Sequence, residues 1–237
     1  MFSTPKIFSD IPGLVSYVWD KTLPMRPRQF HDESPEYKEW VRVLEETFGI
    51  EKIFFMAQCQ SDEILEITDL NCWAMHHVDA CYTRLHNISL NVVVADCVPI
   101  LFYVRAQHIV WVVHAGWRWS TAHILLKTLN SLRENYNSRP EDILLYLWPS
   151  ISQKYYEVGE DVTLQFSDES VICKDEKYYL DLRWENLRQV REFWIPERNI
   201  EVSDECTYEF SEKYFSYRRE WLRKNFVCGM GLREVWK

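Results

Sequence analysis

The chain has 237 residues, of which 47% are hydrophobic and 15% aromatic, and its formal net charge is −9. The length allows one large domain or two small ones, and the apolar content suffices for a sizeable core, which excludes a disordered chain. The acidic balance argues against nucleic acids and anionic membranes as general partners, although it is compatible with a local basic pocket. No apolar run approaches the roughly 18 residues of a membrane helix.

Cysteine usage and the first residues indicate a cytoplasmic protein. The seven cysteines are an odd number without any C-x-x-C pair, which favours free thiols in a reducing compartment. Pro5 and Asp10 stand where a secretory signal would be apolar. No G-x-G-x-x-G or Walker sequence occurs, which argues against a glycine-rich phosphate loop. The sequence leaves the oligomeric state open.

Hydrophobic periodicity predicts strands and helices along the chain. The expected strands cover 13–19, 53–57, 64–67, 91–95, 98–104, 109–114, 143–148, 200–202 and 226–230. The expected helices cover 35–48, 121–135 and 182–193, with a smaller one around Val162 and Phe166 and a short turn or helix at 209–215. Gly49 should end the first helix, and Ser120 or Thr121 should cap the second. Segments 21–36 and 69–77 should be irregular.

These elements are mixed without strict alternation of strand and helix. Such an order predicts the α+β fold class, with mixed β-sheets covered by helices. The chain has no internal repeat and no Ser/Gly-rich linker that would mark a domain boundary. We therefore expect residues 1–237 to form a single domain.

Residues 90–122 combine two strongly apolar runs with residues that can do chemistry. Asp96 and Cys97 interrupt the first run, and Pro99 follows closely, so the backbone should bulge or turn at the cysteine. His114 ends the next run, 17 positions after Cys97. The two residues could be a nucleophile and its base, two of three zinc ligands, or a buried cysteine and a histidine that caps a strand.

Two further segments carry basic and aromatic side chains. Gly116 permits a sharp turn, after which Trp117 and Arg118 could supply a stacking face and an anion clamp. Near the C-terminus, Tyr217 and Arg218 lie in an aromatic and basic run, which could be a solvated turn or a substrate wall with a ring for stacking and a guanidinium for phosphate or carboxylate.

The sequence of residues 94–101 and 114–118, VADCVPIL and HAGWR, resembles the YfiH family pattern T-A-D-C-x-P followed by H-A-G-W-R-G. Five more segments resemble family motifs in the same order: 79–83, 148–151, 156–159, 206–207 and 215–219. The family is also described as multicopper polyphenol oxidoreductases or laccase domains, as purine nucleoside phosphorylases and as peptidoglycan editing factors. Its fold resembles the catalytic domain of cytotoxic necrotizing factor.

The resemblance implies an enzyme that phosphorolyses or deaminates purine nucleosides, so its partners would be small molecules, a nucleoside and phosphate. Cys97 and His114 would be catalytic and would hold zinc or activate the attacking group. Arg118 would bind an anion such as phosphate. Asp96, Tyr217 and Arg218 would complete the substrate site.

The chain departs from the family pattern at three positions. Gln60 stands where the family has the histidine that is the third zinc ligand, which predicts a weak zinc site or a metal-free pair unless His76 or His77 compensates. Trp119 and Trp148 stand at family glycine positions and could narrow the site. Copper is not expected, because the seven histidines are scattered and no His-x-His occurs.

These departures leave two alternatives to the nucleoside enzyme. A Cys–His pair can hydrolyse amides, which fits the peptidoglycan-editing description and a substrate among peptidoglycan precursors. A degenerate member without catalysis, acting as a binding protein, would explain the loss of the histidine at Gln60.

Overall fold

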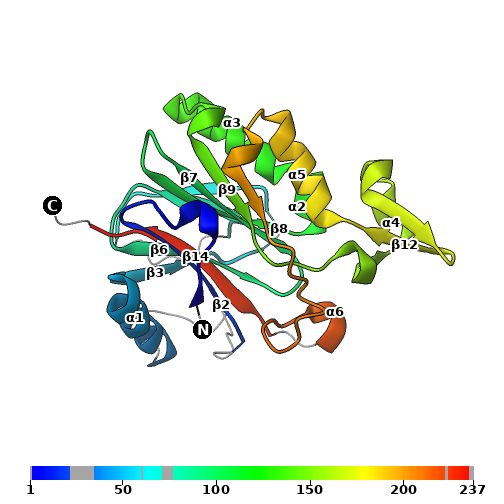
Figure 1. Cartoon of the computed structure of the whole chain (residues 1–237), viewed down its shortest axis with the longest axis horizontal. Helices are drawn as coiled ribbons and strands as arrows, with labels where there is room; N and C mark the ends of the chain where they lie inside the picture. The colour runs from blue at the N-terminus through cyan, green and yellow to red at the C-terminus, as the bar shows by residue number, and fades with distance from the viewer. Residues whose placement is uncertain (1, 22–34, 60, 71–76, 222–223, 235–237) are drawn as a thin grey trace.

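Two large β-sheets stack on each other at the centre of the molecule, and helices cover their outer faces (Figure 1). The structure is a computed structural model and describes residues 2–21, 35–59, 61–70, 77–221 and 224–234. The five-stranded sheet has the order β1 (Phe2–Ser3), β2 (Leu14–Trp19), β14 (Phe226–Leu232), β6 (Ile88–Val94), β3 (Lys52–Phe55). The six-stranded sheet has the order β13 (Ile200–Val202), β9 (Ile143–Leu147), β7 (Val98–Val104), β8 (Ile109–Ala115), β5 (Ala80–Thr83), β4 (Ile64–Ile67).

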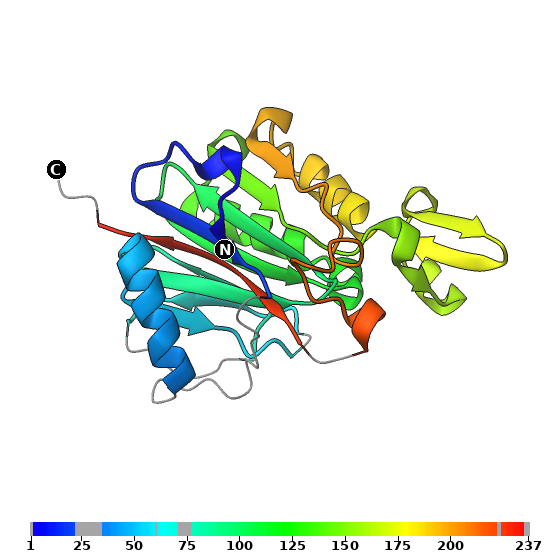
Figure 2. The same cartoon turned by 60° about the horizontal axis from the view of Figure 1, so that its bottom comes forward.

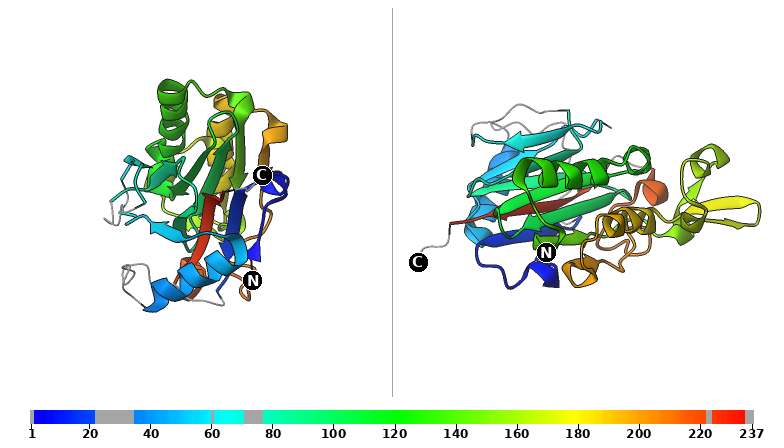
Figure 3. Two further views of the ribbon diagram at one scale, coloured as in Figure 1. Left: turned by 90° about the vertical axis from the view of Figure 1, so that its left-hand side faces the viewer. Right: turned by 90° about the horizontal axis from the view of Figure 1, so that it is seen from above.

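The central strands are apolar on both faces because each sheet is covered on both sides. In β7, Leu101 faces the core between the two sheets, whereas Ile100 and Phe102 face the helices. In β6, Val92 faces the inter-sheet core and Val93 the opposite layer. The result is four layers, helix–sheet–sheet–helix, visible edge-on in Figure 3.

Helix α1 (Pro35–Phe48) covers the five-stranded sheet with Trp40 and Leu44, while α2 (Trp117–Thr121), α3 (Ile124–Tyr136) and α5 (Leu182–Glu192) lie on the six-stranded sheet. Short 3₁₀ turns occupy Lys6–Phe8, Pro140–Asp142, Gln153–Tyr155, Asp168–Ser170 and Glu197–Asn199. Helix α6 (Tyr217–Glu220) is a single turn. None of the described helices is long and apolar enough to cross a membrane.

A small arm projects from the body of the molecule (Figure 2). It consists of β10 (Glu157–Val158), β12 (Lys177–Leu180) and β11 (Val171–Lys174), an antiparallel sheet with β12 in the middle, together with α4 (Glu160–Thr163). The arm joins the body directly before α5, where the Asp181 side chain accepts a hydrogen bond from Trp184 N and caps that helix.

The predicted α+β class with mixed sheets under helices is confirmed, as is the first helix with both ends at the expected residues. Gly49 follows it with φ 71°, and its N–H binds the carbonyl of Glu45. The predicted helix 121–135 is wrong in one respect. It is two helices, because His123 adopts a left-handed conformation (φ 56°) between α2 and α3, and Ser120 and Thr121 lie inside α2 instead of capping it.

The prediction of a small helix around Val162 and Phe166 needs correction, because this helix includes Val162 but ends before Phe166. Segment 209–215 forms turns, one of the two predicted alternatives. Strand β11 and helix α6 were not expected. Strands β6 and β7 follow each other in the chain but belong to different sheets, so residues 95–97 cross from one sheet to the other. The segments expected to be irregular, 21–36 and 69–77, lie largely outside the described residues.

Candidate active site

Cys97 lies where the chain crosses between the two large sheets. Strands β7 and β8 are antiparallel with Val98 opposite Ala115, which brings Cys97 next to Gly116. A Cβ atom added at Gly116 would lie 3.1 Å from Cys97 Sγ and 3.9 Å from His114 Nε2. The absence of a side chain at position 116 therefore leaves room for the thiol beside the imidazole.

His114 is held between Cys97 and Asp79. Its Nδ1 atom lies 2.7 Å from Asp79 Oδ1, and its main-chain N–H donates to the Asp79 carbonyl at 2.8 Å. The other ring nitrogen faces Cys97, with which the imidazole forms a side-chain hydrogen bond. Burial of the ring lowers the pKa of His114, but the electrostatic interactions and hydrogen bonds with Cys97 and Asp79 outweigh this effect and raise the pKa to about 10.

Asp79 also fixes the loop that follows β3. It is fully buried, and its Oδ2 atom accepts hydrogen bonds from the main-chain N–H of Ser61 at 2.8 Å and of Cys59 at 3.3 Å. These two residues flank Gln60 in the sequence, and Gln60 itself lies outside the described residues. One carboxylate thus orients the imidazole and anchors the chain on both sides of position 60.

Asp96 anchors the C-terminal segment to the site. Its backbone has φ 96°, and its Oδ1 accepts from the Thr207 hydroxyl at 2.7 Å while its Oδ2 accepts from Arg218 N at 2.7 Å. Burial raises the pKa of the Asp96 carboxyl group despite these bonds and one from Ser216. Because both carboxylate oxygens are bonded to protein groups, Asp96 positions Arg218 next to the Cys97 turn.

Two arginines lie at the site. Arg118 is exposed at the start of α2, and its guanidinium lies 4.1 Å from the ring centroid of Trp117. Within the described part of the chain nothing accepts a hydrogen bond from this group, so it is available to an anion. The Arg218 guanidinium donates to the Glu157 carbonyl and lies 5.2 Å from the ring of Tyr156.

Tyr217, the other predicted substrate residue, is 48% exposed, and its ring lies 5.7 Å from that of Trp221. The structure places it next to Arg218 on α6 without a contact to Cys97 or His114 among the described interactions. The two tryptophans that stand at family glycine positions lie in different parts of the structure. Trp119 lies beside Gly116, whereas Trp148 is buried in the inter-sheet core against Tyr146.

The sequence analysis assigned no role to two residues that the structure places at the site. Asp79 was matched to a family motif without a function, although a carboxylate directly before a buried strand is a signal for a polar contact at the strand end. Tyr156 was matched in the same way. Burial and the charge of Cys97 raise the pKa of the Tyr156 phenol, which also lies within the electrostatic reach of Asp96 and Arg118.

Residues 27–232 match the family described as multi-copper polyphenol oxidoreductase laccase. The chain belongs to this family, the YfiH family. A purine nucleoside phosphorylase of Clostridium acetobutylicum is 30% identical over 197 residues, which are 81% of each chain. The purine nucleoside phosphorylase YfiH of Escherichia coli is 32% identical over 175 residues, 71% of this chain and 69% of that protein. A purine nucleoside phosphorylase of Bacteroides thetaiotaomicron is 35% identical over 153 residues, but the match spans only 57% of its length.

Solved structures of family members share the fold. YlmD from Geobacillus stearothermophilus superposes with a TM-score of 0.83 over 97% of this chain and 94% of its own, at 24% identity. The YfiH protein of Bacillus licheniformis gives a TM-score of 0.81 over 93% of both chains, also at 24% identity. The two-sheet architecture is therefore common to these proteins.

The family description implies a metal, and the residues present fit it only in part. Cys97 Sγ and His114 Nε2 are two suitable donors, and Asp79 orients the histidine as carboxylates do behind metal-bound imidazoles. Within the described ranges, no three Cys, His, Asp or Glu side chains form a group that could hold a metal ion. His77 is exposed, and Gln60 and His76 lie outside those ranges. Two donors do not fit a resident zinc ion, which takes three or more protein ligands.

Proposed function

We propose that this YfiH-family protein is an enzyme that cleaves or deaminates purine nucleosides at the Cys97–His114–Asp79 cluster. The names of its relatives in three bacteria support the substrate class. The observation that carries the proposal is the arrangement of His114, bonded to Asp79 on one side and to Cys97 on the other, with a nearby guanidinium of Arg118 that has no hydrogen-bond partner among the described residues.

In phosphorolysis, a phosphate oxygen forms a bond to the ribose C1′ atom while the bond from C1′ to the base nitrogen breaks. Arg118 would bind the phosphate, with Arg218 near it, and bring the nucleophile close to the sugar. The base leaves with the electron pair of the broken bond and needs a proton. His114, whose pKa of about 10 keeps it protonated at neutral pH, can donate that proton.

Deamination of adenosine would use the same groups differently. Water adds to C6 of the base, and ammonia leaves. The Cys97 thiolate can take a proton from the water, and protonated His114 can give one to the departing amine. No step in either reaction is assigned to a metal, since the described donors do not fit one.

The test is to incubate the purified protein with adenosine or inosine, with and without phosphate, and to separate nucleoside, free base and deaminated nucleoside by chromatography. Cys97→Ser and His114→Gln should abolish product formation, and Arg118→Met should raise KM for phosphate. Cys173→Ser is the matched control, because Cys173 is an exposed cysteine on the arm. Lack of product with the wild-type protein, or equal product with Cys97→Ser, rejects the proposal.

A second function is favoured by the fact that Cys97, His114 and Asp79 line up as nucleophile, base and orienting carboxylate. In amide hydrolysis, the thiolate would form a bond to the amide carbon, His114 would protonate the departing amine, and water would then cleave the thioester. Muramyl peptides are the substrates to assay, with release of an amine as the readout. Failure of iodoacetamide to label Cys97 faster than Cys173 at neutral pH would count against a thiolate nucleophile.

A further inference from the structure

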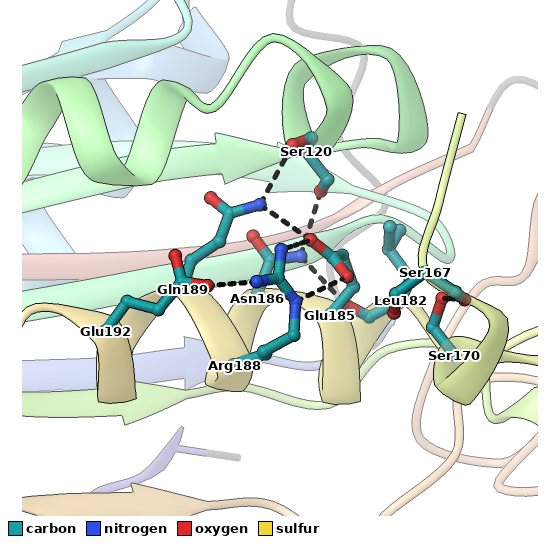
Figure 4. Close-up of polar contacts among 9 residues, drawn as sticks. All are labelled: Ser120, Ser167, Ser170, Leu182, Glu185, Asn186, Arg188, Gln189 and Glu192. Carbon is teal, nitrogen blue, oxygen red and sulfur yellow. Dashed lines mark hydrogen bonds and ion pairs between the residues drawn. The ribbon is translucent and has the colours of Figure 1, made fainter.

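Helix α2 carries Arg118 into the site and is hydrogen-bonded to α5 through Ser120. Ser120 is fully buried, and its oxygen atoms accept hydrogen bonds from two side-chain amides of α5, which are also fully buried (Figure 4). Asn186 Nδ2 donates to Ser120 Oγ at 2.9 Å, and Gln189 Nε2 donates to the Ser120 carbonyl oxygen at 3.0 Å. The attachment lies two positions after Arg118 and therefore on the same short helix.

Helix α2 depends on such attachments. It has five residues, its N-cap residue Gly116 offers no side-chain hydrogen bond, and the left-handed residue His123 separates it from α3. A helix this short is not stable by itself, so its position is set by packing and tertiary hydrogen bonds. Loss of the bonds from α5 would allow α2 to shift while the sheet beneath it keeps its structure.

A shift of α2 would act directly on the site. Gly116, at its start, forms the wall against which Cys97 Sγ and His114 Nε2 lie. Arg118 follows one residue into the helix and is held there only by its contact with Trp117 of the same helix, as far as the described residues show. The position of its guanidinium therefore depends on the position of α2.

The hydrogen bonds between α2 and α5 are made by fully buried polar side chains. The Glu185 carboxylate is buried beside them and accepts from Arg188 at 2.7 Å and from Gln189 at 3.1 Å. In the described structure, Asn186 Oδ1 and Gln189 Oε1 have no hydrogen-bond partner. Buried acceptors without partners lower stability, so the two amides are better explained by the geometry they impose.

We propose that Asn186 and Gln189 are positioning residues of the site, which hold α2 so that Arg118 stays where the co-substrate phosphate binds. This inference rests on the proposed nucleoside phosphorolysis for its kinetic test. It assigns the residues to anion binding and not to the chemical step, because they contact neither Cys97 nor His114.

The test compares Asn186→Ala and Gln189→Met with the wild-type enzyme. Each removes one hydrogen bond to Ser120, and the expected result is a rise of about tenfold in KM for phosphate, with kcat and KM for the nucleoside nearly unchanged. Thr128→Val is the matched control: Thr128 is fully buried on the neighbouring helix α3, and its hydroxyl has no partner within the described structure. It should leave all three constants unchanged. Circular dichroism checks that each variant is folded. If one of the two α5 variants does not fold, the other is enough for the test.

A double-mutant cycle with Arg118→Met separates positioning from general damage. If Asn186 acts through Arg118, Asn186→Ala should add little to KM for phosphate once Arg118 is gone. An equal fold-change in both backgrounds, or a fall in kcat without a change in KM for phosphate, overturns the inference.

Calorimetric titration with inorganic phosphate makes the test independent of turnover. The wild-type protein and Thr128→Val should bind phosphate, Arg118→Met should lose the binding, and the α5 variants should weaken it about tenfold. Binding of this kind without turnover would reject the proposed function and support the inference. Absence of binding that depends on Arg118, or unchanged binding by the α5 variants, would overturn the inference even if the enzyme is active.

Discussion

Asp79 decides how His114 is presented to Cys97. Its Oδ1 atom engages Nδ1 at 2.7 Å, which leaves Nε2 for the thiol and stabilises the charged ring. Asp79→Asn keeps the shape but removes the charge, and an amide in this place can favour the wrong tautomer of the ring. We expect kcat to fall by up to about 10⁴-fold, the loss seen when the orienting aspartate of a catalytic triad is replaced by asparagine. Asp142→Asn, which weakens an ion pair with the exposed Arg139 away from the site, is the control and should leave kcat unchanged. Unchanged turnover in Asp79→Asn would contradict this role.

The charge of His114 also predicts a pH dependence of stability. Its pKa is raised from 6.5 to about 10 in the folded protein, so the fold favours the protonated ring. That contribution is complete below pH 6.5 and is lost as the pH rises towards 10. Urea unfolding of chelator-treated wild-type protein and His114→Gln at several pH values should show a stability difference that shrinks over this interval. A difference that is constant, or that grows with pH, would show that the ring is neutral in the folded state.

At the level of elements, the sequence predicted what depends on local periodicity. Helix α1 was predicted with both ends, because its apolar positions repeat at helical spacing and a glycine follows. Helix α6 was missed because four residues give no periodic signal. The break between α2 and α3 was missed because His123, which adopts the left-handed conformation, is neither glycine nor asparagine. The separation of β6 and β7 into two sheets was missed because both strands are apolar on both faces, and such a pattern does not say which strand lies beside which.

Strand β14 contains a position at which only glycine fits. Gly229 lies opposite Tyr17 of β2 and Asn91 of β6, whose side chains meet over it with Tyr17 Oη 2.7 Å from Asn91 Oδ1. A Cβ atom at Gly229 would overlap both side chains. Gly229→Ala should therefore lower the free energy of unfolding by about 1–3 kcal/mol, and Tm with it.

The control for this prediction is Gly159→Ser, at the exposed N-cap of α4, where serine is a preferred residue. A Cβ atom there would meet only the carboxylate of Asp161, which is exposed and can turn aside, whereas the side chains over Gly229 are buried. It should leave Tm unchanged or raise it slightly. Calorimetry on both variants decides the matter: equal Tm values for Gly229→Ala and the wild-type protein would mean that the Tyr17–Asn91 pair can move aside at no cost.

At the scale of the whole molecule, the site is assembled from distant parts of the chain. Cys97 and His114 were predicted together because Cys97 interrupts one apolar run of β-strand length and His114 ends the next, and β7 and β8 are indeed neighbours. Asp79 reaches them only because β5 pairs with the other edge of β8, and Tyr156 only because the arm returns to the body beside Arg218. Neither pairing leaves a periodic signal in the sequence, so the roles of these two residues follow from the fold alone.

Metal content is the property in which this protein should differ from family members that have a histidine at position 60. Cys97 and His114 supply two donors, and a glutamine carbonyl is a poor third ligand for zinc. After dialysis against a chelator and reloading with zinc, elemental analysis should find well under one zinc per chain in the wild-type protein. Gln60→His should bring the content close to one, because Asp79 already anchors the chain on both sides of that position.

The double variant Gln60→His, Cys97→Ser should lose the zinc again, since two good ligands do not form a stable site. This control separates a restored site from adventitious binding to the new histidine. Retention of one zinc by the wild-type protein would contradict the expectation and return the metal to the mechanism. Unchanged low content in Gln60→His would favour a remodelled site, because the remaining ligands would then fail to accept a metal even when the family's donor set is complete.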